Sequence, residues 1–208
     1  MIPPDHAALI VVDVQNDFCP AGALAVKAGH EVVPAINRIA PFFAVVVCTQ
    51  DWHPPDHRSF ADNHPGKEPF STTEMPYGTQ VLWPAHCVQG TEGAAFHRDL
   101  LTHRADVVIR KGFRPHIDSY STFYENDRVT PTGLAGYLRD RRVREVWLAG
   151  LATDFCVHYS AIDAVRVGFS VTVLEDACRA IDLEGSLGRA MDAMRAEGVK
   201  FARAADIG

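Results

Sequence analysis

A cysteine within residues 150–158 lies in a setting that suits a nucleophile. The segment follows an apolar run, 146–149, that is typical of a buried strand, and it leads into a run with helical apolar spacing. Thr153 and Asp154 are candidate N-caps, which would place Cys156 in the first turn of that helix. Free N–H groups and partial positive charge at a helix start lower the pKa of a thiol and can bind an oxyanion. The alternative interpretation is an inert, packed cysteine.

Two charged residues that follow other apolar runs could activate this thiol. Asp13 comes directly after residues 7–12, and Lys111 comes shortly after residues 105–109. A cysteine thiol is mostly protonated at neutral pH, so a nucleophile needs a base or a positive neighbour. Asp13 would accept the proton if burial raises its pKa, and Lys111 would stabilise the negative charge. The alternatives are a loop hydrogen bond for Asp13 and a solvated side chain for Lys111.

A second group of residues has the composition of a metal site. Asp51 and His53 are two residues apart, so in extended backbone both side chains point the same way, and His86 supplies a third ligand. One carboxylate and two imidazoles suit zinc, iron(II) or manganese, and three protein ligands leave positions for water or substrate. A simple hydrogen-bonded pair in a loop is the alternative. Further residues remain open as ligands or as holders of bound water: His57, Ser59 and His64. Cys87 is interpreted as a packing residue.

The residues named so far need a scaffold that brings distant segments together. Apolar runs alternate with runs of helical spacing, which predicts a parallel α/β sheet with right-handed crossovers. The carboxyl ends of such strands meet at one edge, where ligands bind. The expected strands are 7–12, 44–48, 105–109, 145–150, 169–174 and 199–201, and the expected helices are 30–43, 133–141, 154–167 and 183–196.

Loops are expected to overhang this edge of the sheet. Residues 51–104 are rich in proline and histidine and are predicted to form a long loop, which inside one domain is usually functional. Phe18, Trp83 and Tyr120 lie in the predicted loops and could stack on a flat ring, or they could simply anchor those loops. His158, two residues beyond the cysteine, is interpreted as a packing residue.

Size and composition narrow the possible partners. The chain has 208 residues, of which 47% are hydrophobic, so we expect one domain spanning residues 1–208. The formal net charge of −6 and the lack of a basic stripe argue against nucleic acid and anionic membrane as partners. No signal peptide or membrane-spanning run is recognisable. Five scattered cysteines without a C-x-x-C pair fit a reducing cytoplasm.

Five motifs occur in order along the chain: DVQNDFC at 13–19, QDWHP at 50–54, WPAHCVQGT at 83–91, KG at 111–112 with DSYS at 118–121, and GLATDFCV at 150–157. Together they resemble the nicotinamidase/pyrazinamidase family of isochorismatase-like cysteine hydrolases. The resemblance covers essentially the whole chain. It implies a three-layer α/β/α sandwich with a mainly parallel six-stranded sheet in the Rossmann-like order 3-2-1-4-5-6.

The resemblance also implies a reaction, the hydrolysis of nicotinamide to nicotinate and ammonia through a cysteine thioester. In the implied site, Asp13, Lys111 and Cys156 are catalytic. Asp51, His53 and His86 would hold one divalent metal ion, zinc with iron or manganese as alternatives, which orients the substrate ring. Phe18, Trp83 and Tyr120 would bind the substrate. The amides of Ala152 and Cys156 would form an oxyanion hole after a cis peptide bond between Leu151 and Ala152.

Three other functions stay open at this point. An amidase of the same superfamily would cleave ureido or N-carbamoyl groups, although the metal triplet argues against it. A metal-water hydrolase would leave Cys156 inert, and a non-catalytic protein would bind nicotinamide without releasing ammonia. By analogy the chain is expected to act also on pyrazinamide, to serve NAD salvage, and to be either a monomer or a homo-oligomer.

Overall fold

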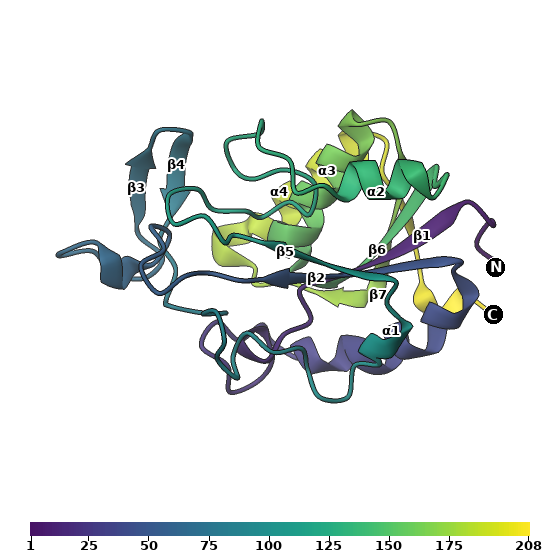
Figure 1. Cartoon of the computed structure of the whole chain (residues 1–208), viewed down its shortest axis with the longest axis horizontal. Coiled ribbons are helices and arrows are strands. Elements are labelled where there is room, and N and C mark those ends of the chain that lie inside the picture. Colours follow the sequence, from purple (N-terminus) through teal and green to yellow (C-terminus); the bar gives the residue numbers. More distant parts are fainter.

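A six-stranded sheet runs through the molecule, and all of its strands are parallel (Figure 1). The computed structural model describes all 208 residues. The strands are β1 (Ala7–Val12), β2 (Val45–Asp51), β5 (Val107–Lys111), β6 (Glu145–Leu151), β7 (Ser170–Arg179) and β8 (Lys200–Ala202). They lie in the order β5-β2-β1-β6-β7-β8, which is 3-2-1-4-5-6 in order of occurrence and confirms the expected topology.

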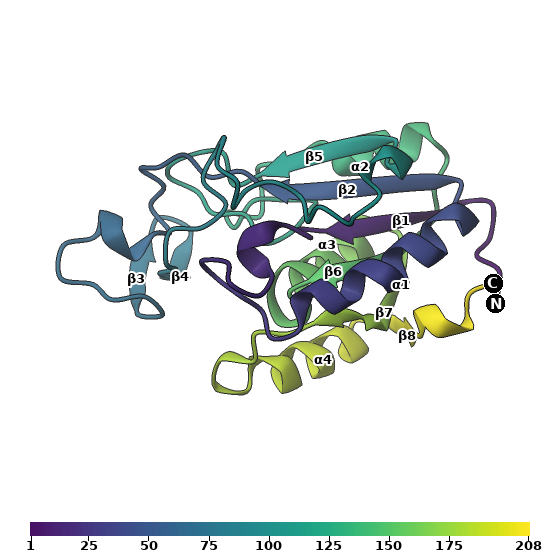
Figure 2. The same ribbon diagram turned by 90° about the horizontal axis from the view of Figure 1, so that it is seen from below.

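Helices cover both faces of the sheet and complete the expected α/β/α sandwich. Helix α1 (Val32–Ile39) lies on one face, and α2 (Leu134–Asp140), α3 (His158–Arg166) and α4 (Ser186–Ala196) lie on the other (Figures 1 and 2). Strand β1 is central and buried along its whole length, which explains its uninterrupted apolar sequence. Its alternate residues enter different cores, so Leu9 packs on the α1 side and Ile10 on the α3 side.

The chain leaves β1 toward β2 on one side, and β6 pairs with β1 on the other. This reversal of strand order is where open α/β sheets bind ligands, beyond the carboxyl ends of the strands. The two strands approach closely at Gly150, where φ is +125° and an added Cβ would lie 2.1 Å from the carbonyl oxygen of Val12. Only glycine fits there. The loops that follow β1 and β6 therefore start side by side.

The expectation of a long loop over residues 51–104 is wrong in part. An antiparallel hairpin, β3 (Thr72–Met75) and β4 (Gly78–Val81), stands away from the main sheet (Figures 1 and 2). The hairpin is largely exposed, so its sequence lacks the apolar alternation that marks a half-buried strand. The buried side chain of Gln80 in β4 bonds to Asp118 in the main body of the protein, so the hairpin contacts the candidate site.

The cysteine segment also differs from its prediction. Residues Thr153–Val157 form a π-helical turn before α3, and neither Thr153 nor Asp154 caps a helix. The carboxylate of Asp154 instead accepts the N–H groups of Ile181 and Asp182 at 3.0 and 2.8 Å. Asp154 thus ties the cysteine turn to the segment after β7. No helix of the structure combines the length and apolar character needed to cross a membrane.

Candidate active site

Asp13, Lys111 and Cys156 meet at the carboxyl edge of the sheet, although they come from three different strand ends. The Lys111 ammonium lies 2.8 Å from Asp13 Oδ2 and 3.5 Å from Cys156 Sγ, and it donates to the carbonyl oxygen of Ser119 at 2.7 Å. All three site side chains are buried. The structure therefore brings a thiol, a carboxylate and an ammonium into one group, as the sequence predicted.

Asp13 is held by its neighbour in the sheet. Its backbone has φ +48°, in the left-handed region, where the chain turns out of β1. Thr49 Oγ1 donates to Asp13 Oδ1 at 2.6 Å and accepts the Asp13 N–H at 3.2 Å. Sequence reasoning missed Thr49, because a threonine in a β-strand is common and its partner lies in another strand.

Burial is the main influence on the protonation of Asp13 and Cys156. It raises the pKa of Asp13, with the nearby Asp51 carboxylate adding to the effect and Lys111 opposing it. Burial likewise raises the pKa of the Cys156 thiol well above its usual range, although Lys111 opposes this and Asp13 adds to it. The expectation that the helix start lowers the pKa of Cys156 is therefore wrong, because desolvation outweighs the favourable charges. The resting thiol keeps its proton and has an acceptor beside it in Asp13.

Lys111 is also bonded to Asp51, which sequence reasoning did not foresee. Its ammonium donates to Asp51 Oδ1 and so lies between two carboxylates. Burial alone would lower the pKa of Lys111, but Asp13 and Asp51 raise it well above its usual range. The lysine thus stays charged and connects the cysteine group to the neighbouring group of histidines.

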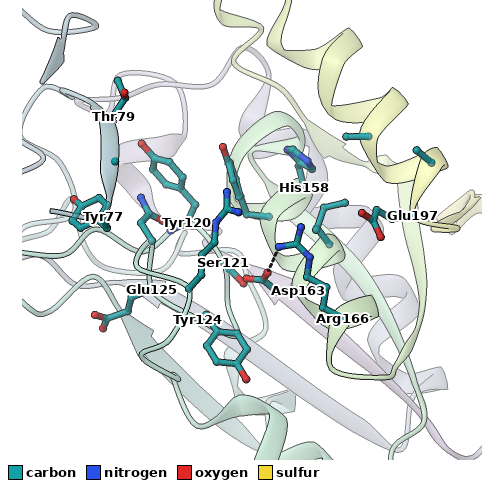
Figure 3. Close-up of a pocket in the computed structure, with 17 residues that line it drawn as sticks. Tyr77, Thr79, Tyr120, Ser121, Tyr124, Glu125, His158, Asp163, Arg166 and Glu197 are labelled. Atoms are coloured by element: carbon teal, nitrogen blue, oxygen red, sulfur yellow. Dashed lines mark hydrogen bonds and ion pairs between the residues drawn. The ribbon is translucent and has the colours of Figure 1, made fainter. Parts of the chain in front are cut away.

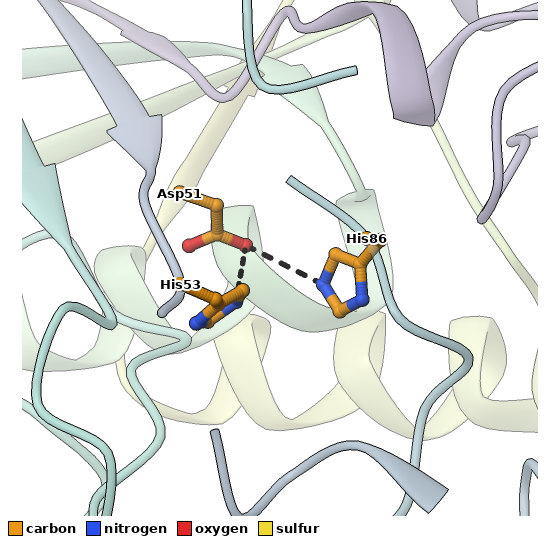
Figure 4. Close-up of side chains that lie close together, drawn as sticks. All are labelled: Asp51, His53 and His86. Atoms are coloured by element: carbon orange, nitrogen blue, oxygen red, sulfur yellow. Dashed lines mark ion pairs between the residues drawn. The ribbon is translucent and has the colours of Figure 1, made fainter. Parts of the chain in front are cut away.

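Asp51, His53 and His86 converge as predicted (Figure 4). Asp51 Oδ2 lies 3.6 Å from His53 Nε2 and 3.9 Å from His86 Nε2, and all three side chains are buried. Ligand atoms around a tetrahedral ion with bonds of about 2.1 Å are about 3.4 Å apart, which is close to these separations. Because Asp51 ends β2 and His53 follows in extended backbone, both side chains reach the same point.

Backbone carbonyl groups orient the two imidazoles. His53 Nδ1 lies 2.8 Å from the oxygen of Gly112, and His86 Nδ1 lies 2.8 Å from the oxygen of Pro84. Each Nδ1 therefore carries a proton and donates, which directs Nε2 of both rings toward Asp51, as in metal-binding histidines. Burial lowers the pKa of His86 to about 4, so its ring is neutral at neutral pH. The donor set fits a divalent metal ion.

Burial also favours a neutral His53, but Asp51 outweighs it and raises the pKa of that ring. A bound cation would compete with this proton, because a histidine must be deprotonated at Nε2 to act as a ligand.

The other candidate ligands of the sequence make hydrogen bonds of their own. His57 and Ser59 bind each other, with 2.7 Å between His57 Nδ1 and Ser59 Oγ. His64 lies apart and its Nε2 donates to the Arg58 carbonyl at 2.7 Å.

Asp118 is a buried residue of the site to which sequence reasoning gave no role. Its carboxylate groups with His53 and His57, and one of its oxygens accepts from Gln80 Nε2 of β4 at 2.9 Å. The only sequence signal was its place in the motif at 118–121. The hairpin that was expected to be loop thus fixes a carboxylate beside the histidines.

We expect Gly112→Ala to weaken metal binding. Gly112 has φ +67°, and an added Cβ would lie 2.4 Å from His53 Cε1, so the ring would have to move. Loss of an orienting partner typically lowers metal affinity about 10- to 100-fold. Zinc titration of the metal-free protein measures this. Gly66→Ala is the matched control, because Gly66 also has a positive φ, +76°, but open space around it. Equal zinc affinities of the two variants would contradict the expectation.

A small apolar cavity connects the two groups. Cys156 and Ala152 line it from the cysteine turn, and Asp51 and His86 line it from the histidine side. The peptide bond before Ala152 is cis, as expected. The expected ring-binding residues all contribute walls, together with Asp118 and three apolar residues that the sequence did not single out. The aromatic walls are Phe18, Trp83, Tyr120 and Phe155, and the aliphatic ones are Leu24 and Ile181.

The volume of this cavity is about 20 Å³, room for about one water molecule. A flat ring therefore enters only when a wall side chain moves. Behind Tyr120 lies a second cavity of about 680 Å³ on the surface, which contains His158 and the ion pair of Asp163 with Arg166 (Figure 3). This larger cavity is lined by neither the thiol nor the histidine group, so the smaller one is the candidate site.

The sheet order and the buried cysteine group define the class of protein: a doubly wound parallel α/β fold with a cysteine at the switch point. A family model described as the isochorismatase domain matches residues 7–206. The chain therefore belongs to the isochorismatase family.

Individual relatives extend this result. A nicotinamidase from Acinetobacter baylyi is 54% identical over 196 residues, which are 94% of this chain and 92% of the relative. The crystal structure of PnC1 from L. infantum in complex with nicotinate has a TM-score of 0.87 and 38% identity, covering 100% of this chain and 97% of that one. A pyrazinamidase of Pyrococcus horikoshii in complex with zinc has a TM-score of 0.77 and 38% identity, covering 96% of this chain and 99% of that one.

Proposed function

We propose that this protein is a nicotinamidase, which hydrolyses nicotinamide to nicotinate and ammonia through a thioester on Cys156. One observation carries the proposal: a single aromatic-walled cavity is lined on one side by a thiol beside an acid and on the other by a histidine group. A carboxamide on a flat heteroaromatic ring matches these walls once a wall side chain has moved to admit it, with the amide toward the sulfur. The similarity to relatives named nicotinamidase supports the same substrate.

In the proposed mechanism, Asp13 takes the proton of Cys156, and the thiolate attacks the carboxamide carbon. The raised pKa of Asp13 supports this transfer, because the carboxylate accepts a proton more readily than usual, whereas the raised pKa of the Cys156 thiol opposes it. Lys111 stays charged and keeps carboxylate and sulfur in register. The N–H groups of Ala152 and Cys156 stabilise the tetrahedral oxyanion.

Asp13 then returns its proton to the leaving amine, so ammonia departs and a thioester remains. In the second half, Asp13 accepts a proton from water as the water attacks the thioester carbon, and the thiol is restored when the acid leaves. Phe18, Trp83 and Tyr120 hold the ring by stacking and edge contacts. The aromatic walls also exclude bulk water from the reacting atoms.

Asp51, His53 and His86 would hold the metal ion in this proposal, with zinc as the first choice and iron or manganese as alternatives. When bound, such an ion supplies a Lewis acid that orients the ring nitrogen and bound water. The zinc complex of the Pyrococcus pyrazinamidase supports the choice of metal. Pyrazinamide, with the same carboxamide on a related ring, would be a second substrate. A cytoplasmic role in NAD salvage fits the substrate.

Three rival functions are less well supported. A carbamoyl amidase would share the cysteine group but has no need for a pair of oriented imidazoles beside the ring site. In a metal-water hydrolase the Cys156 thiol would be dispensable, which fits poorly with its position between Asp13 and Lys111. A protein that only binds nicotinamide would not need a buried acid beside the thiol.

The test is ammonia release by the zinc-loaded protein from nicotinamide, pyrazinamide and N-carbamoyl amino acids. We expect turnover of the first two and none of the third. Iodoacetamide should abolish activity, with protection by nicotinate, since it alkylates the thiol. Activity that survives full alkylation of Cys156 would support the metal-water mechanism instead, and turnover of the carbamoyl substrate alone would refute the proposal.

A further inference from the structure

Asp17 joins the loop after β1 to the segment that carries His86. Its Oδ2 accepts the backbone N–H of Cys87 at 2.7 Å, and its Oδ1 accepts the N–H of Ala23 at 3.2 Å. A Cβ added to Gly93 would lie 2.1 Å from Asp17 Oδ2. The Asp17 carboxylate thus occupies space that only a glycine at position 93 leaves open. This close packing fixes the carboxylate beside the backbone of Cys87.

The turn that Asp17 contacts has an unusual backbone. Cys87 has φ +46°, in the left-handed region that residues with side chains rarely adopt. Its N–H is bonded to Asp17, and its carbonyl oxygen accepts the N–H of His53 at 3.0 Å. Cys87 therefore lies between two of the residues that would hold the metal, and both of its backbone polar groups are used to fix them.

We propose that Asp17 is a positioning residue for the metal site, because it holds the left-handed turn at Cys87 and so sets the direction of the His86 ring. Hydrogen bonds from an N–H to a carboxylate are among the stronger ones in proteins. Without this acceptor the buried N–H of Cys87 is unpaired, and the turn relaxes toward a commoner backbone conformation. The His86 ring, next in the chain, then leaves the position opposite Asp51. This inference rests on the proposed metal site.

The alternative is that Asp17 merely holds two loops together, and the chain offers a matched control for that. Asn16, its neighbour, connects the same loops, because its Nδ2 donates to the carbonyl oxygen of Glu92 at 2.8 Å. Asn16 does not touch the turn at Cys87. A loop-tethering role predicts similar effects for substitutions at 16 and 17, whereas a positioning role predicts an effect on metal binding only at 17.

The experiment measures the zinc affinity of the metal-free full-length chain by competition with a chromophoric chelator, alongside its thermal unfolding. The variants are Asp17→Ala, Asp17→Asn, Asn16→Ala and His86→Ala. We expect Asp17→Ala to weaken zinc binding about 10- to 100-fold, as loss of an orienting partner does. Asp17→Asn keeps one acceptor oxygen and should fall between Asp17→Ala and wild type. Asn16→Ala should stay within about twofold of wild type, although its unfolding temperature falls.

The outcomes separate this inference from the proposed function. If His86→Ala binds zinc as tightly as wild type, the metal site itself is wrong. If His86→Ala loses zinc while Asp17→Ala binds it like Asn16→Ala, only the positioning role is overturned. Should Asp17→Ala fail to fold, Asp17→Asn decides, because zinc binding weaker than in Asn16→Ala supports the role and equal binding overturns it.

Discussion

Replacing Cys156 by alanine is expected to abolish ammonia release from nicotinamide while leaving the fold and the binding of zinc and nicotinate intact. The sulfur is the only thiol in contact with both Lys111 and the cavity, so no neighbouring group can form the thioester. Removal of a catalytic nucleophile typically lowers kcat by about 10⁴- to 10⁶-fold. Ammonia release at saturating substrate measures the loss, and calorimetric titration measures retained nicotinate binding.

Cys178→Ala is the control for this prediction. Cys178 is also a buried thiol near the sheet edge, with its Sγ 4.0 Å from the carbonyl oxygen of Leu148, but it does not line the cavity. We expect this variant to keep activity within severalfold of wild type. Residual turnover by Cys156→Ala above about one thousandth of wild type would show that another group performs the chemistry.

Replacing Lys111 by methionine is expected to destabilise the protein strongly as well as to inactivate it. The ammonium lies fully buried between Asp13 and Asp51, and methionine removes its charge at similar volume. Two carboxylates then lie close together without a compensating charge. Breaking a buried ion pair from one side costs about 3–5 kcal/mol. Urea unfolding of the metal-free proteins at neutral pH measures the change in the free energy of unfolding.

Lys67→Met serves as the matched substitution. Lys67 is exposed and donates only to the carbonyl oxygen of Thr72 at 3.1 Å, so its loss should change stability by no more than about 0.5 kcal/mol. Metal-free protein is used because a bound cation would partly neutralise the two carboxylates. Equal unfolding midpoints for Lys111→Met and wild type would mean that Asp13 and Asp51 carry no buried negative charge.

Much of the fold follows from local sequence. The uninterrupted apolar strand at β1 and the alternation of apolar runs with helical spacing predict a parallel sheet, because both patterns record which faces of an element are buried. The order of Asp13, Asp51, Lys111 and Cys156 after four strand ends then places them at one edge. The exposed hairpin at Thr72–Val81 escaped prediction, since neither of its faces is buried well enough to leave a pattern.

The amino-acid sequence alone shows which residues reach the carboxyl edge of the sheet. How those residues bond to one another there depends on contacts between distant segments. Thr49 and Asp13 are 36 residues apart, and Lys111 reaches Asp51 across 60 residues. The raised pKa of Cys156 likewise depends on complete burial by distant loops, and it reversed the expectation based on a local helix start. Side-chain partners and desolvation depend on three-dimensional packing. Unlike the burial of a helix or strand face, this packing leaves no periodic pattern in the sequence.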